Sequence, residues 1–228
     1  MCFSATASFT AGTALIAVGG LTVHKSEGNV ELPIAMVPLL FGIQQVTEGV
    51  VWISLTRDLP AVRTVATYVY SMFSHVLWPI FVPFAILLIE ISRRRRQALG
   101  AFLVLGLAVG LYLLYFLVRF PVTAHVHGSR ITYDSPHFYI VGVIVLYLLA
   151  TSVSGLFSTH RCINAFGVLA FILAIVAYLV SVTTFVSVWC FYAAILSFLV
   201  YLHFSGPMQA CRTLTRGSEM RDTRGDVP

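Results

Sequence analysis

The sequence predicts an all-α membrane protein, a bundle of seven transmembrane helices with its N-terminus outside and its C-terminus in the cytoplasm. Of the 228 residues 58% are hydrophobic and only 10% are charged, whereas about 25% of the residues in a soluble domain are charged. The mean hydropathy is +0.90. Because the charges fall mostly between long apolar runs, we attribute the net charge of +5 to membrane topology rather than to a nucleic-acid partner. The expected partner is the lipid bilayer.

A helix needs about 20 largely apolar residues to cross the hydrocarbon core of a membrane. Seven runs meet this requirement, namely 5–23, 33–56, 65–92, 97–119, 137–157, 163–184 and 186–204. The boundary between the last two contains no Pro, Gly or charge, so six spans are the alternative. We expect residues 1–206 to form the transmembrane domain. The polar residues 207–228 are expected to be a disordered cytoplasmic tail.

The basic residues between the spans give the orientation. The loops that would lie on one side, together with the tail, carry ten of them, Lys25, Arg93 to Arg96, Arg161, Arg212, Arg216, Arg221 and Arg224, and the other side carries four, Arg57, Arg63, Arg119 and Arg130. Cytoplasmic loops are enriched in Lys and Arg, which places the first group inside. The sizeable external connection, Phe120 to Pro136, includes a Thr132–Pro136 stretch that is typical of a structured turn and is expected to form a lid.

Ionisable residues deep in a membrane helix are costly, so they are candidates for function. Glu90, Arg119, His137 and His203 lie near span ends, where a side chain can reach the interface, and only Glu48 and His75 are predicted to lie deep. With a rise of 1.5 Å per residue, Glu48 lies about 12 Å and His75 about 15 Å below the outer face. Since their helices are consecutive and joined by a short loop, we expect the two side chains to meet.

Polar residues repeat at helical spacing around this pair and predict a pocket in the outer half of the bundle. Its expected lining is Gln44, Gln45, Glu48 and Trp52 from one span and Tyr68, Ser71, His75 and Trp78 from the next. Pro79 and Pro83 each remove a backbone hydrogen bond and predict a kink just below. The alternative is that Glu48 and His75 only pin neighbouring helices together.

The N-terminal segment carries two further expectations. Ser4, Ser8 and Gly12 recur at four-residue steps, which favours close helix packing. Cys2, at the outer end, is a candidate thiolate ligand or nucleophile over the pocket.

The sequence is compatible with three functions and does not identify a cofactor. The first is binding or proton-coupled transport of a small molecule or ion by Glu48 and His75. The second is a membrane-embedded, metal-dependent enzyme acting on a lipid-like substrate, with Glu48, His75 and Cys2 as catalytic or metal-binding candidates. Further ligands for such a site would come from His125, His127 or His137. The third is a structural or accessory subunit of a membrane complex.

The string Met-Cys-Phe-Ser-Ala-Thr-Ala-Ser-Phe at residues 1–9, the segment Phe41 to Trp52, and His75 with Trp78, Pro79 and Pro83 resemble a family of small multi-span proteins of bacteria and archaea. That family has no assigned function. The resemblance implies the plasma (inner) membrane of a prokaryote and supplies no activity. A weaker likeness, to seven-span hydrolases that include the alkaline ceramidases, is carried by Ser71 and His75 alone. The transmembrane Asp and the His-x-x-x-His pair of those enzymes are missing here.

Overall fold

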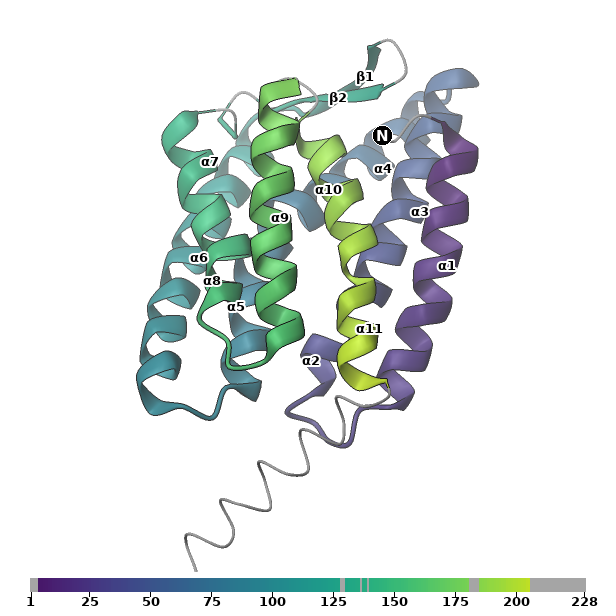
Figure 1. The fold of residues 1–228 in the computed structure, drawn as a ribbon. Coiled ribbons are helices and arrows are strands. Elements are labelled where there is room, and N and C mark those ends of the chain that lie inside the picture. The colour runs from purple at the N-terminus through teal and green to yellow at the C-terminus, as the bar shows by residue number, and fades with distance from the viewer. Residues whose placement is uncertain (1–3, 128–129, 136, 139, 181–184, 206–228) are drawn as a thin grey trace, which may run out of the picture.

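The computed structural model describes residues 4–127, 130–135, 137–138, 140–180 and 185–205 as a bundle of helices with a small β-hairpin across one end (Figure 1). Six helical runs among these residues are long and apolar enough to cross a membrane. They are α1 (Ala5–His24), α2 with α3 (Leu32–Ala35 and Val37–Thr56), α4 with η1 and α5 (Pro60–Ser71, Met72–Leu77 and Trp78–Ile89), α6 (Arg93–Arg119), α9 (Arg161–Val180), and α10 with α11 (Phe185–Leu196 and Phe198–Phe204).

The remaining predicted span, 137–157, is shorter in the structure than the other six and is not among the helices long enough to cross a membrane. It is helical over Val141–Leu156, as α7 (Val141–Leu148), a π-helical turn η2 (Leu149–Val153) and α8 (Ser154–Leu156). The two spans with the weakest predicted boundary are instead separate helices, α9 and α10, which pack against each other. The predicted tail, 207–228, lies outside the described residues.

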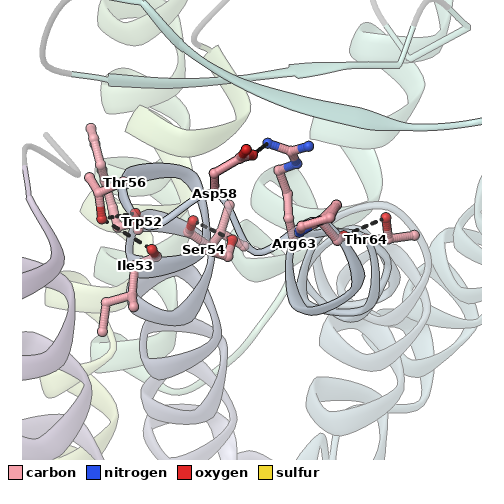
Figure 2. A network of polar contacts seen from close by, with 9 residues as sticks. Trp52, Ile53, Ser54, Thr56, Asp58, Arg63 and Thr64 are labelled. Atoms are coloured by element: carbon pink, nitrogen blue, oxygen red, sulfur yellow. Dashed lines mark hydrogen bonds and ion pairs between the residues drawn. The ribbon is translucent and has the colours of Figure 1, made fainter.

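The two ends of the bundle are formed by different elements (Figure 1). At the hairpin end lie the start of α1, the turn from α3 to α4 and the hairpin itself. That turn is short, with Asp58 in a left-handed conformation (φ 47°) and its carboxylate 3.7 Å from the Arg63 guanidinium (Figure 2). At the opposite end, which we call the arginine end, lie α2, the end of α11 and the first turn of α6 with Arg93 to Arg96.

The hairpin corrects the all-α expectation. The strands β1 (Thr123–His127) and β2 (Arg130–Asp134) pair antiparallel, so the residues expected as a turn at Thr132–Pro136 are largely strand. In β2 the buried Ile131 and Tyr133 alternate with more exposed neighbours, which is the two-residue period of a strand with one covered face. This period was visible in the sequence, although within a short loop it was no stronger than the turn signal.

Helices α1 and α3 pack through small residues, as expected from the N-terminal pattern. Ser8 is fully buried, and a Cβ atom added to Gly12 would lie 2.7 Å from Val46 Cγ2. One added to Gly19 would lie 2.4 Å from the backbone nitrogen of Leu39. Ser4, which was expected on this face, is exposed and instead caps α1, with its hydroxyl accepting a 3.2 Å bond from the Ala7 N–H.

Helices α5 and α6 meet where Pro83 interrupts the hydrogen bonding of α5. Pro83 has no N–H for the Pro79 carbonyl one turn earlier, and α6 covers that carbonyl with Gly106. A Cβ atom added to Gly106 would lie 1.8 Å from the Pro79 oxygen, far inside van der Waals contact. Only glycine fits at this position.

Replacing Gly106 by Ala is expected to lower the free energy of unfolding by about 1–3 kcal/mol, because the methyl group forces the two helices apart. Gly100→Ala is the matched control in the same helix, since a Cβ atom there meets nothing within 4 Å. The control should be neutral or stabilising by up to about 1 kcal/mol, through helix propensity. Denaturation of both purified variants in detergent measures the difference. Equal stabilities would contradict the α5–α6 packing.

Candidate functional site

Buried polar side chains from three helices meet in the half of the bundle nearer the hairpin. Glu48 of α3 is fully buried, and its Oε1 accepts a 2.8 Å hydrogen bond from the Ser187 hydroxyl of α10. One turn earlier, Gln44 Oε1 accepts a 2.6 Å bond from the indole Nε1 of Trp78. Gln45 beside it is also fully buried. Each bond joins residues far apart in the sequence, so tertiary packing creates the cluster.

A buried thiol lies among these groups. Cys190 of α10 is 1% exposed and lies beside the Gln44 and Tyr70 side chains. Glu48 and Tyr147 are close enough to interact with it electrostatically. Cys190 therefore connects the α3 side of the cluster to Tyr70 of α4 and Tyr147 of α7.

A π-helical turn, η1 (Met72–Leu77), carries the next group of polar residues. Its last bond runs from the Trp78 N–H to the Phe73 carbonyl, five residues back. The Ser74 carbonyl therefore lacks the Trp78 N–H that an α-helix would supply, and Pro79 has no N–H to offer. The Tyr147 hydroxyl donates a 2.5 Å hydrogen bond to this freed carbonyl. One side chain from α7 thus completes the backbone bonding of η1.

His75 lies within this turn and is 1% exposed. Its Nδ1 is hydrogen-bonded to the Ser74 hydroxyl at 2.7 Å, and its Nε2 to the Ser135 hydroxyl at 3.1 Å. The Phe138 ring packs on the imidazole with 4.5 Å between ring centroids. Both ring nitrogens are thus engaged by serines, one from the same helix and one from the segment after the hairpin.

The hairpin and the residues that follow it cover the cluster. Tyr133 of β2 stacks on Tyr70 with 4.5 Å between centroids and an interplanar angle of 7°. Ile131, Tyr133 and Phe138 are each at most 1% exposed, so this segment is packed as tightly as the helices. Two residues of the segment expected to form a lid, Tyr133 and Ser135, therefore contact Tyr70 and His75, and the lid itself stays a prediction.

Most of the predicted lining residues are buried. Gln44, Gln45, Glu48, Trp52, Ser71, His75 and Trp78 are all at most 7% exposed. Tyr68 differs, because it is partly exposed and packs against Val76, Leu117 and Val122. The inward tyrosine is Tyr70. Glu48 and His75 lie in the same half of the bundle, but among the described residues no hydrogen bond or ion pair joins them.

The π turn explains why Tyr70 rather than Tyr68 points into the bundle. Ala66, Tyr70, Ser74 and Trp78 are buried at four-residue intervals. In a continuous α-helix each such step would rotate the side chain by about 40°. The wider π turn compensates for that rotation and keeps the four residues on one side of the helix. The spacing of a regular helix predicts Tyr68 on the inner side, whereas the buried tyrosine is Tyr70.

Several buried atoms beside the cluster have no hydrogen-bond partner among the described residues. They include the Gln44 Nε2, the Trp52 Nε1 and the Ser71 Oγ. The Cys190 thiol beside Gln44 is at best a weak acceptor. Unpartnered buried polar atoms are rare in folded proteins and commonly indicate a bound water, ion or ligand. The grooves on the described surface lie elsewhere, one at the arginine end and one along η1 and α5, lined by the apolar side chains Met72, Phe73, Val76, Leu77, Ile80, Phe81 and Phe84.

The expected metal ligands are not brought together in the described part of the chain. His125 lies on the exposed hairpin, 3.3 Å from an Asp134 carboxylate oxygen, and His137 stacks on Phe116. Among the described residues no three His, Cys, Asp or Glu are placed to hold a metal ion. Cys2 lies outside them, so its predicted role as ligand or nucleophile stays a prediction.

Glu90 is a second buried carboxylate and corrects the expectation that it reaches the membrane interface. It is 2% exposed and bonded through both oxygens. Oε1 accepts from the Ser92 N–H, and Oε2 from the N–H and hydroxyl of Thr159, at 2.8 and 3.2 Å. His203, also expected at the interface, is 6% exposed and lies against His160. Glu90 therefore holds together two turns at the arginine end.

Residues that sequence reasoning missed are Tyr70, Ser74, Ser135, Tyr147, Ser187 and Cys190. Ser187 and Cys190 share one helical face through their three-residue spacing, which was a readable signal. No signal marked Tyr147 or Ser135, because each gains its role from a residue at least 60 positions away.

With six long apolar helices in its described part and a buried polar cluster, the bundle has the architecture of a multi-pass membrane protein. The model of a family of unknown function, DUF6629, matches residues 1–214. The chain therefore belongs to this uncharacterised family, which agrees with the resemblance seen in its sequence. No curated protein and no solved structure matches the chain.

Replacing Tyr147 by Phe is expected to lower the free energy of unfolding by about 1–3 kcal/mol, since the Ser74 carbonyl is left buried without a donor. This exceeds the average of about 0.6 kcal/mol for side-chain bonds in membrane proteins, because no backbone N–H can replace the lost hydroxyl. Tyr115→Phe is the control, since Tyr115 is 61% exposed, and should change stability by no more than about 0.5 kcal/mol. Equal losses in denaturation of the two variants would contradict this role.

Proposed function

We propose that this protein is a multi-pass membrane protein that moves protons through the cluster around Glu48 and His75. The observation that carries the proposal is the group of buried polar atoms beside Glu48 that lack partners among the described residues. Waters, ions or a polar solute bound at these atoms would satisfy Gln44, Trp52 and Ser71. Glu and His are the side chains that transporters use in proton relays.

The interruptions of the helices support this reading. Transport sites in membranes are commonly built where helices are discontinuous, since backbone groups there are free to bind or to move. Here η1 carries His75, and η2 is a second π turn that packs against α5 and α9. Such turns are rare in helices and frequent at functional sites.

The packing favours access from the hairpin end. The cluster reaches toward the surface through Ser135, whereas the arginine half of the bundle is filled by apolar side chains such as Phe41, Ile86 and Leu99. Passage across the protein therefore requires movement of that apolar half. The π turn and Pro83 provide a segment of reduced backbone bonding where the helix can bend.

The orientation and the number of spans belong to the same proposal. The hairpin end faces outward, and the chain crosses the membrane seven times, with α7 to α8 as the fifth crossing. In support, α7 starts after the hairpin, and Thr159, just past α8, bonds to Glu90 at the arginine end. The positive-inside rule places Arg93 to Arg96 in the cytoplasm. The membrane is the plasma (inner) membrane of a prokaryote, as the family resemblance implies.

The two other functions make different predictions. A metal-dependent enzyme acting on a lipid-like substrate would purify with a stoichiometric metal, and its ligand set would need Cys2 to join Glu48 or His75. An accessory subunit would purify with a partner and lose only stability when Glu48 is changed. An accessory subunit does not account for the unpartnered atoms within the bundle, and an enzyme would need its substrate to bind at them.

Vesicles containing the purified protein and an internal pH dye are expected to acidify faster than protein-free vesicles when acid is added outside, with valinomycin and potassium holding the membrane potential at zero. Glu48→Gln and His75→Gln should each slow this flux at least tenfold, because each removes a proton-exchanging group. Glu27→Gln and His125→Gln are matched controls at exposed positions and should retain it. A flux no faster than in protein-free vesicles, or equal in all four variants, would overturn the proposal.

Orientation is tested by labelling intact cells with a membrane-impermeant maleimide, in a background with Cys2 and Cys211 replaced by Ser. Cys162 and Cys190 are buried and remain in place. Val126→Cys in β1, where the native side chain is 46% exposed, should react in intact cells. Arg94→Cys in the first turn of α6 should react only after the cells are permeabilised. The reverse pattern would show the opposite orientation.

A further inference from the structure

The arginine end carries a cavity that belongs to no part of the buried cluster. It has a volume of about 540 Å³ and is lined by Leu87, Ile91, Arg93, Arg96, Gln97 and Gly100. It lies where α5 ends and α6 begins, with polar residues on one side and apolar residues on the other.

The positive charge at this cavity is uncompensated. Among the described residues, the side chains of Arg93, Arg94 and Arg96 form no hydrogen bond or ion pair, whereas Arg95 donates a 2.8 Å bond to the Ser158 carbonyl. The nearest acid in the sequence, Glu90, is buried and bonded through both oxygens within the fold. Three arginines are thus available to an anion from outside the chain.

The rest of the lining suits a hydrocarbon chain. Ile91 is 64% exposed although it is a large apolar residue, and Leu87 lies one turn before it. Gly100 has no side chain, and a Cβ atom added there would meet nothing within 4 Å, so the surface of α6 is open at this point. The cavity therefore offers guanidinium groups for an anion beside an apolar strip.

This combination matches the chemistry of a phospholipid. Guanidinium groups bind phosphate through paired, charge-assisted hydrogen bonds. Arginine clusters beside a transmembrane helix attract anionic lipids, whose acyl chains lie along the apolar helix surface. Free phosphate would use the arginines but would leave Ile91 and the open surface at Gly100 exposed.

We propose that this cavity binds an anionic phospholipid from the leaflet at the arginine end, with the phosphate on Arg93, Arg96 and Gln97 and an acyl chain along Leu87, Ile91 and Gly100. The bound lipid anchors the α5–α6 connection at the membrane surface. This site is separate from the Glu48 cluster and does not depend on proton movement there.

Binding is tested with the purified full chain in detergent by titrating phosphatidylglycerol, phosphatidylcholine or inorganic phosphate and counting bound molecules by native mass spectrometry. Phosphatidylglycerol should bind, and the other two should not at equal concentration. Arg93→Gln combined with Arg96→Gln should weaken its binding by roughly 30-fold, because two surface arginines are lost. Arg57→Gln combined with Arg119→Gln removes the same charge from exposed positions at the hairpin end and should leave binding unchanged.

Gly100→Leu tests the apolar half of the site without changing the charge. It should also weaken phosphatidylglycerol binding, while size-exclusion chromatography shows a folded protein. Equal loss in both double variants would reduce the effect to non-specific charge attraction and overturn the proposal. Equal binding of phosphatidylcholine, binding of inorganic phosphate at the same concentration, or no effect of Gly100→Leu would overturn it too.

Discussion

Within an apolar bundle every backbone carbonyl needs a hydrogen-bond donor. The site around His75 is organised by the Ser74 carbonyl, which receives no donor from its own helix. The π turn directs the Trp78 N–H to Phe73, and Pro79 offers no N–H, so the Ser74 carbonyl depends on the Tyr147 hydroxyl. That bond fixes α7 against η1. The same turn keeps Tyr70, Ser74 and Trp78 on one side, where they meet Tyr133, His75 and Gln44.

The hairpin connects this interior to one end of the protein. Its Tyr133 covers Tyr70, and the Ser135 that follows it holds the Nε2 of His75. Movement of the hairpin away from the bundle would therefore free a ring nitrogen of His75 and expose Tyr70 at the same time. Access to the cluster and the hydrogen bonding of its histidine are consequently coupled by geometry.

The two buried glutamates show how one residue type serves two purposes. Both Glu90 oxygens accept bonds from the Ser92 and Thr159 backbone or hydroxyl, so its carboxylate is part of the scaffold of the arginine end. Glu48 instead lies among side chains, with the Ser187 hydroxyl on one oxygen and the Cys190 thiol nearby. Side-chain partners can reorient more readily than backbone groups, which is why Glu48 is the better candidate for proton exchange.

Composition and hydropathy determined the class of fold, because long apolar runs must be buried in lipid or in the protein, whichever side chains they meet. The burial of Glu48 and His75 could also be predicted, because the position of a residue along an apolar run is a local property of the sequence. The same holds for the close packing at Ser8 and Gly12, since small side chains are visible in the sequence itself. The strands of the hairpin had a readable two-residue period but competed with turn signals in a short loop.

Only the tertiary structure decided which residues complete the site. Tyr147, Ser135, Ser187 and Cys190 act on partners in other helices, and nothing local in the sequence specifies such a pairing. The π turn likewise depends on its context, because its freed carbonyl is tolerated only where Tyr147 can reach it. The sequence thus indicated that Glu48 and His75 are buried, and the packing of distant helices determined what each of them touches.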